Sequence, residues 1–336
     1  MWLKKQCNQA HTIAIIGMSK NAGKTTVMNT ILKAYFGAKI AITSIGLDGE
    51  NQDTLSFKEK PKIRVYKGMY VATAIDALKE STASIKVIER TSITTPLGEI
   101  ILGEVTQAGT ILLAGPSTNS GLLEIKHMFE KLSVEKIIID GALFRKSFAR
   151  QHLVDGVILV SGAVYSKDLN RLVNDTKTII DQLTLEDVAV PELPNGLKCA
   201  VVNTTGETIW ATDLSLSLDP TQIHQLMAED FKVVQIHGAL TDSMVPLLLK
   251  YREKLEGKTL IIDDAANILC SSQNYRYLEQ VGLRIRTRHP VEILFVGINP
   301  FSPSGYTFDP FEMKQMMSQA LDCPVINVKT DLELIL

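Results

Sequence analysis

The segment that decides the fold runs from His11 to Thr26 and reads His-Thr-Ile-Ala-Ile-Ile-Gly-Met-Ser-Lys-Asn-Ala-Gly-Lys-Thr-Thr. Its apolar start, residues 13–16, predicts a buried parallel strand. The strand breaks at Gly17, a loop of small and polar residues follows, and a helix is predicted to begin at Lys24. Because a helix start carries unpaired N–H groups and a partial positive charge, such a loop is suited to bind an anion.

The glycines and the lysine of this loop make the expected anion a phosphate, and they predict a nucleotide-dependent protein. Lys24 is expected to lie along the β- and γ-phosphates, and the Thr25 hydroxyl is expected to ligate Mg²⁺. The alternative is a strand–turn–helix junction that carries Gly-Lys-Thr by coincidence. The candidate nucleotide-binding residues are Gly17, Lys20, Asn21, Ala22, Gly23, Lys24, Thr25 and Thr26.

The spacing of the two glycines is longer than in the common motif. Five residues separate Gly17 from Gly23, whereas G-x-x-x-x-G-K-[ST] has four. The longer form resembles the loop of dethiobiotin synthetase and of the cobyrinic-acid amidating synthetases, which are P-loop proteins. The pattern indicates nucleotide binding and leaves the reaction open.

Two acidic residues follow predicted strands downstream of this loop. Asp48 lies in the polar loop after a strand predicted at 39–45, and Asp140 closes the apolar run 137–139 in the Walker B arrangement. Since the carboxyl ends of parallel strands face the ligand, both are candidates to act with Lys24 in catalysis and with Thr25 in holding Mg²⁺. Each aspartate precedes a glycine, so an ordinary turn is the alternative.

Length, charge and composition narrow the class of protein. The chain has 336 residues, a net charge of −2 and a hydrophobic content of 45%, which predicts globular domains and gives no electrostatic case for nucleic acid or an anionic membrane. No apolar stretch approaches the ~20 residues of a membrane span, and the polar start is no signal peptide, so the cytoplasm is predicted. Four scattered cysteines, of which Cys199 and Cys270 are expected to be buried, predict no disulfide framework, and six dispersed histidines predict no transition-metal site.

The predicted fold is α/β, a P-loop NTPase with a mostly parallel sheet, a β-rich insertion or edge hairpin at about 62–105, and a smaller C-terminal α/β unit. The expected domains are 11–254, which binds the nucleotide, and 255–336. A strand at 110–114 is assigned to the parallel sheet. The C-terminal unit is expected to contain strands at 259–262, 291–296 and 325–328 and a helix at 310–320.

The loop 297–309 is rich in proline, glycine and aromatic residues. Its stiffness and aromatic content predict a contact with a partner or ligand, and the alternative is an ordered surface loop whose aromatic rings cover the core.

Several segments together resemble a reactivating-factor subunit of the family that serves the adenosylcobalamin-dependent lysine aminomutase of amino-acid-fermenting bacteria. The resemblance rests on residues 16–26, 46–50, 139–143, 238–242 and 299–303. It implies a chaperone-like subunit that uses ATP and Mg²⁺, works beside a second ATPase subunit, and exchanges damaged cobalamin out of the inactivated aminomutase. Whether two copies of the chain form a homodimer stays open.

The identity of the nucleotide base rests on two further observations. In the dethiobiotin synthetase group an Asn at the tip of a late strand contacts adenine, and this resemblance implies that role for Asn203; the alternative is an Asn that forms a turn. The guanine-reading N-K-x-D motif is absent, which favours ATP over GTP.

Two other functions compete with a reactivase. The first is a biosynthetic ligase that activates a carboxylate as an acyl phosphate, which the longer loop favours. The second is a nucleotide-binding scaffold with negligible turnover. A ligase is expected to hydrolyse ATP only with its small substrate, a reactivase subunit to hydrolyse faster with its protein partner, and a scaffold to bind ATP without hydrolysis.

Overall fold

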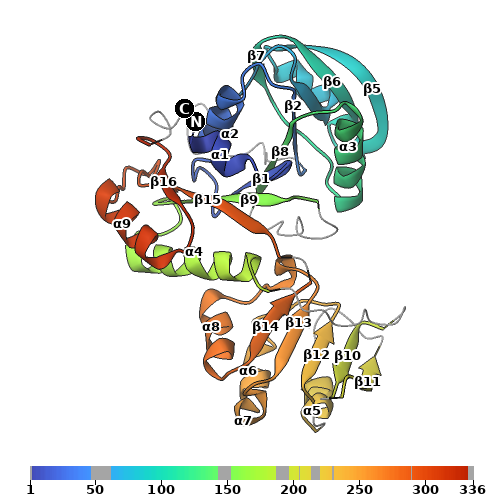
Figure 1. Ribbon diagram of the computed structural model, residues 1–336, viewed down its shortest axis with the longest axis vertical. Coiled ribbons are helices and arrows are strands. Elements are labelled where there is room, and N and C mark those ends of the chain that lie inside the picture. The colour runs from blue at the N-terminus through green and yellow to red at the C-terminus, as the bar shows by residue number, and fades with distance from the viewer. Residues whose placement is uncertain are drawn as a thin grey trace. The chain divides into compact units, whose positions relative to one another are not determined.

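The computed structural model describes residues 2–46, 62–142, 153–186, 197–203, 205–212, 220–228, 231–288 and 290–331. The chain divides into two compact units, whose elements are labelled in Figure 1. Unit 1 comprises residues 1–148, 152–177 and 291–336, and unit 2 comprises residues 149–151 and 178–290.

Unit 1 is built on a large sheet, which among the described residues has nine strands in the order β16-β15-β9-β1-β8-β2-β4-β6-β5. The strands from β16 to β4 run parallel, and β4, β6 and β5 pair antiparallel. The strands are β1 (Thr12–Gly17), β2 (Ile40–Ser44), β4 (Tyr70–Ala74), β5 (Ser84–Thr95), β6 (Gly98–Gln107), β8 (Lys136–Ala142), β9 (Gly156–Gly162), β15 (Glu292–Asn299) and β16 (Val325–Asn327).

Strand β1 lies inside this sheet, between β8 and β9. All six of its residues are buried, as expected of an apolar strand that is covered on both faces. Ile13 and Ile15 join Val27 and Ile31, two apolar residues of the following helix, in one core cluster. This packing places Gly17, the last residue of β1, at the carboxyl edge of the parallel strands.

Two helices of unit 1 begin at side-chain caps. The Thr118 hydroxyl accepts the N–H of Gly121 at the start of α3, and the Asp309 carboxylate accepts the N–H of Glu312 at the start of α9. The helices are α1 (Trp2–Cys7), α2 (Lys24–Ala34), α3 (Asn119–Lys131), α9 (Pro310–Ala320) and the first part of α4 (Leu169–Leu183). Within the described part of the chain, no helix is both long and apolar enough to cross a membrane.

Unit 2 has its own smaller mixed sheet, with the order β11-β10-β12-β13-β14 among the described residues. Strands β12, β13 and β14 run parallel, whereas β10 is antiparallel to both of its neighbours. Phe231 and Tyr275 are among the largest fully buried side chains. The elements are β10 (Cys199–Val202), β11 (Thr208–Thr212), α5 (Pro220–Ala228), β12 (Val233–Ile236), α6 (Val245–Leu249), α7 (Arg252–Leu255), β13 (Thr259–Ile262), α8 (Ser272–Gln280) and β14 (Arg284–Thr287).

The expected division into 11–254 and 255–336 differs from the observed one. The strands that were expected to share a C-terminal unit belong to two sheets, because β13 pairs with β12 and β14 whereas β15 and β16 extend the sheet of unit 1 beside β9. Unit 2 therefore interrupts the chain of unit 1 from residue 178, within α4, to residue 290, before β15.

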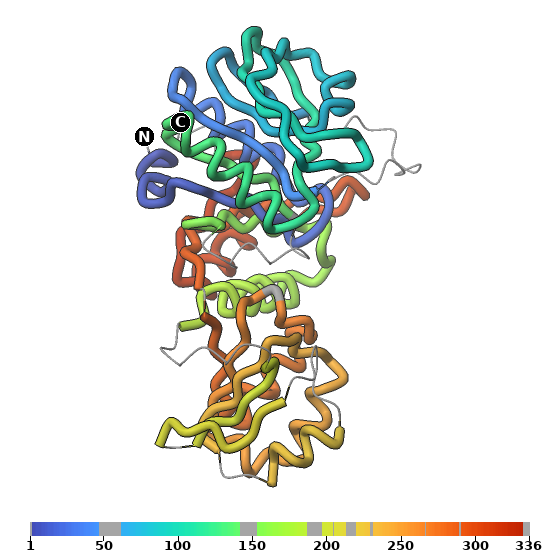
Figure 2. Tube along the Cα trace, turned by 90° about the vertical axis from the view of Figure 1, so that its right-hand side faces the viewer, coloured from blue at the N-terminus to red at the C-terminus, as the bar shows by residue number. Residues whose placement is uncertain are grey.

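The expected edge hairpin is present, and its surroundings differ from the prediction. Strands β5 and β6 form a long antiparallel hairpin at one edge of the large sheet (Figures 1 and 2). The expected insertion 62–105 also holds β4, which pairs parallel to β2. The assignment of a strand at 110–114 to the parallel sheet is wrong: the observed strand β7 (Gly109–Ile111) is shorter and pairs antiparallel with β3 (Ile63–Val65) in a separate two-stranded sheet.

The cysteines allow one prediction about thiol chemistry. Cys7, Cys199 and Cys270 are buried, as expected for the last two, and Cys323 is half-buried. Burial raises the pKa of Cys7 and of Cys199 to about 12, and that of Cys323 to about 11. Because the thiolate is the reactive form, we expect iodoacetamide at pH 8 to modify Cys323 before Cys7 and Cys199. Peptide mass spectrometry of the native and the urea-unfolded protein checks this; equal labelling of the native thiols would contradict it.

Candidate functional site

The candidate site begins with the β1–α2 loop, residues 17–23, which follows β1 at the carboxyl edge of the parallel strands. Two of its residues have left-handed backbone conformations, Asn21 with φ 61° and Gly23 with φ 113°. At Gly17 a Cβ atom would lie 2.8 Å from Cγ of Lys24 and 3.2 Å from the carbonyl oxygen of Ser19. Gly23 therefore suits its left-handed backbone conformation, and Gly17 leaves room for the Lys24 side chain.

Met18 anchors this loop to β9 and α4. Its N–H donates to the carbonyl oxygen of Val160 (2.9 Å), and its sulfur lies 3.1 Å from the hydroxyl of Thr176. The same hydroxyl lies 2.9 Å from that of Ser161. These buried residues of β9 and α4 were not predicted, because nothing in the sequence shows which strand and helix lie under the loop.

Helix α2 starts without a side-chain cap. Gly23 occupies the N-cap position, no side chain of the described residues caps it, and the first turn holds no acidic residue. Thr25 and Thr26 lie in that turn and are half-buried, and Lys20 is exposed in the loop. A helix start of this kind offers its backbone N–H groups and its dipole to an anion from outside the helix.

Lys24 and Asp140 are brought together at the ends of neighbouring elements. Lys24 is the first residue of α2, and Asp140 lies near the carboxyl end of β8, the strand beside β1. The Lys24 ammonium donates to the carbonyl oxygen of Gly141 (2.8 Å) and lies 3.4 Å from the Asp140 carboxylate. Both side chains are only 12% exposed, so the ammonium and the carboxylate interact in a largely dehydrated environment.

The carboxyl end of β2 is held in place by Gly115. The Ser44 hydroxyl accepts the N–H of Gly115 (2.9 Å) and donates to the carbonyl oxygen of Gly46 (3.0 Å). A Cβ atom on Gly115 would lie 1.8 Å from the carbonyl oxygen of Ser44, so only glycine fits. Asp48, the second candidate carboxylate, lies outside the described residues.

Asn299 adjoins the loop from the β9 and β15 side of the sheet. It ends β15 and is 6% exposed. A Cβ atom on Gly23 would lie 3.7 Å from the Asn299 Cβ and side-chain nitrogen, and one on Gly162 would lie 2.9 Å from the Asn299 carbonyl oxygen. Sequence reasoning did not name Asn299 as a site residue, although Asn299 lies in the loop 297–309, which was expected to contact a partner or ligand.

Asn203, which was expected at the base, lies in a different sheet. It follows β10 in unit 2, and β10 belongs to the smaller sheet and not to the sheet that holds β1. Its side-chain oxygen accepts the N–H groups of Thr205 and Glu207 (both 2.9 Å), and its side-chain nitrogen donates to the Glu207 carboxylate (3.2 Å). Asn203 therefore closes the β10–β11 turn, which was the alternative interpretation.

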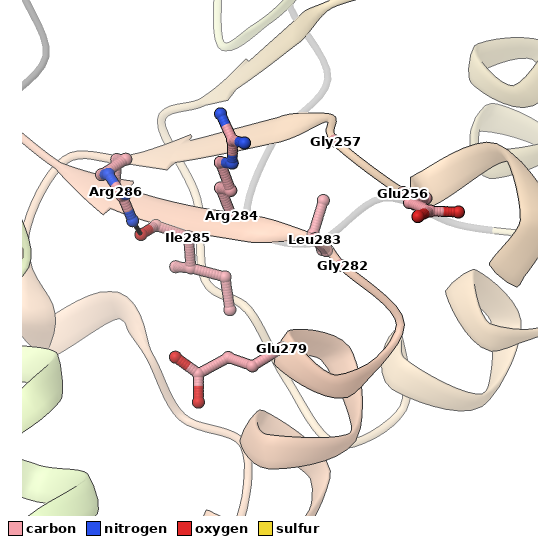
Figure 3. Close-up of a pocket in the computed structure, with 8 residues that line it drawn as sticks. All are labelled: Glu256, Gly257, Glu279, Gly282, Leu283, Arg284, Ile285 and Arg286. Atoms are coloured by element: carbon pink, nitrogen blue, oxygen red, sulfur yellow. Dashed lines mark hydrogen bonds between the residues drawn. The ribbon is translucent and has the colours of Figure 1, made fainter.

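Unit 2 carries a pocket of about 450 Å³ beside β14. Figure 3 shows Arg284 and Arg286 on one side of this strand and Glu279 reaching from α8 on the other. The lining of this pocket contains none of the predicted site residues. Because the lining carries both arginine and glutamate side chains, it does not indicate whether a ligand would be anionic or cationic.

Comparison of the chain with models of protein families, with curated proteins and with solved structures gave no match.

Proposed function

We propose that this chain is a P-loop protein that binds ATP with Mg²⁺ and hydrolyses it as the reactivating subunit of a cobalamin-dependent lysine aminomutase. Nucleotide binding is the part of the proposal that rests on geometry. The reactivating role rests on the resemblance of the five sequence segments named above.

The observation that carries nucleotide binding is the pairing of Lys24 with Asp140. A lysine at the first position of a helix that follows a glycine loop, 3.4 Å from a carboxylate on the neighbouring strand, is the arrangement in which a P-loop lysine and a Walker B aspartate meet. The carboxylate holds the ammonium at the helix start, where a phosphate chain would take over as its partner.

The residues present also suit Mg²⁺. Thr25 and Asp140 provide oxygen atoms beside the helix start, and Mg²⁺ prefers hydroxyl, carboxylate and phosphate oxygens. When bound, Mg²⁺ would neutralise negative charge on the phosphates. The loop N–H groups and Lys24 would bind and orient the phosphates, and Asp140 would hold the water or hydroxyl ligands in place. Asp48 keeps its proposed role as a further carboxylate.

Asn299 is the better candidate for a base contact than Asn203. It ends a strand of the same sheet as β1 and adjoins Gly23. The dethiobiotin synthetase group uses an Asn in such a position for adenine, so Asn299 takes the role that the resemblance first suggested for Asn203.

A ligase that forms an acyl phosphate is the second candidate function, because the five residues between Gly17 and Gly23 match the loop of that group. The two functions differ in what stimulates ATP hydrolysis. A reactivating subunit responds to its aminomutase and to the second ATPase subunit, whereas a ligase responds to a small carboxylate.

The deciding experiment is a reactivation assay. Lysine aminomutase inactivated by turnover is mixed with this chain, the presumed partner ATPase, ATP, Mg²⁺ and fresh adenosylcobalamin, with the Lys24→Ala variant as control. Recovery that needs both ATP and this chain, and that the variant fails to give, supports the reactivating role. No recovery, together with ATP hydrolysis that appears only with a small carboxylate, would favour the ligase.

A further inference from the structure

The segment 299–309, which sequence analysis singled out for its aromatic residues, forms a small, well-tied hairpin at the end of β15. Phe301 and Thr307 form an antiparallel bridge, and Phe308 donates its N–H to the carbonyl oxygen of Pro300 (3.0 Å). The hydroxyl of Tyr306 donates to the carbonyl oxygen of Lys167 (2.9 Å), and its ring packs edge-on against Phe308 at 5.1 Å. The hairpin is therefore fixed to unit 1 at its base and along one side.

The aromatic residues of this hairpin differ in exposure. Phe308 is buried at 8% exposure, whereas Phe301 is 42% exposed. Phe301 is also tied at its backbone, because its N–H donates to the side-chain oxygen of Asn299 (3.2 Å). An exposed ring on a fixed backbone loses little conformational freedom when a flat ligand stacks on it.

The sheet places Asn299, two residues before Phe301, beside the β1–α2 loop. β15 lies two strands from β1, a separation of about 10 Å, and Asn299 reaches back to adjoin Gly23. Lys24 and Asp140 lie on the other side of β1, toward β8. A nucleotide whose phosphates contact the Lys24 ammonium and the N–H groups at the start of α2 could extend its base toward β15, away from Asp140.

We infer that Phe301 is the stacking platform for the base of the bound nucleotide and that the side-chain nitrogen of Asn299 donates to the edge of the same base; this inference rests on the proposed nucleotide binding. The oxygen of the Asn299 amide is taken by Phe301, and no described residue accepts a hydrogen bond from its nitrogen. The nitrogen offers a donor, which suits the ring-nitrogen acceptors of a purine.

The test compares a ligand with a base to a ligand without one. Titration calorimetry measures the affinity of Mg²⁺-ATP and of Mg²⁺-tripolyphosphate for the wild type, Phe301→Ala and Phe301→Tyr. Phe311→Ala is the matched control, because Phe311 is 77% exposed and lies on α9 outside the hairpin. Phe301→Ala is expected to weaken ATP binding about 5- to 150-fold and to leave tripolyphosphate binding unchanged. Phe301→Tyr and Phe311→Ala are expected to bind ATP as the wild type does.

Three results would overturn the inference. Equal ATP affinity of Phe301→Ala and wild type would show that the ring does not touch the base. Equal weakening of ATP and tripolyphosphate would show that Phe301 only supports the loop. A wild-type chain that binds neither ligand would overturn the proposed function itself, and the inference with it.

Discussion

Lys24→Ala is expected to lose much of the stabilisation that Mg²⁺-ATP gives to the folded chain. A ligand that binds only the folded state raises the free energy of unfolding by about 2.7 kcal/mol when the ligand concentration is a hundred times the dissociation constant. Removal of a charged hydrogen-bond donor to phosphate weakens binding by about 1.5–3 kcal/mol, or roughly 10- to 150-fold. Thermal unfolding of wild type and variant over a series of ATP concentrations measures the effect.

The same substitution also acts on the protein without ligand, so a control is needed. Without Lys24 the Asp140 carboxylate, which is 12% exposed, loses its ammonium neighbour, and the folded state is expected to lose about 1–3 kcal/mol. The double variant Lys24→Ala, Asp140→Asn removes both charges and is expected to regain much of this loss. A Lys24→Ala variant that ATP stabilises as well as it does the wild type would contradict the proposed phosphate contact.

Gly115→Ala is expected to destabilise unit 1 by about 3 kcal/mol or more. The new methyl group would lie 1.8 Å from the carbonyl oxygen of Ser44, and a backbone atom cannot move aside as a flexible side chain can. The backbone at the end of β2 must therefore shift, and the Gly115–Ser44 hydrogen bond (2.9 Å) is strained or lost. Urea unfolding, followed by circular dichroism, gives the free energy of unfolding.

Gly37→Ala separates this packing effect from the ordinary cost of replacing a glycine. Gly37 has φ +85°, and a Cβ atom there would meet nothing within 4 Å. Its substitution is expected to cost about 1 kcal/mol, which reflects the left-handed backbone alone. If Gly115→Ala costs no more than Gly37→Ala, the close approach of Gly115 to Ser44 is not a constraint on the fold.

Local patterns predicted individual elements well and their pairing poorly. The strand predicted at 259–262 and the helix predicted at 310–320 have the observed bounds, because each combines an apolar pattern with clear end signals. The pairing of β15 with β9 bridges more than a hundred intervening residues, and no local signal marks it. For this reason the domain boundary predicted between residues 254 and 255 differs from the observed division.

The candidate site shows the same limit. Lys24 and Asp140 were predicted because each sits in a motif with a fixed place relative to a strand or helix. Asn203 and Asn299 both lie at the carboxyl ends of apolar strands, and only the sheet to which each strand belongs distinguishes them. Met18 and Thr176 meet through tertiary contacts that carry no sequence signature.

The interruption of unit 1 by unit 2 has a consequence for biosynthesis. When β9 leaves the ribosome, its sheet partner β15 has not yet been translated, because residues 178–290 come first. At a translation rate of about 5–20 residues per second, this delay is on the order of ten seconds. During that time the apolar strand β9 presents an unpaired edge, the kind of surface on which nascent chains aggregate. Early folding of unit 2 would shorten the distance that β15 must search to find β9, and chaperones would be expected to act in this interval.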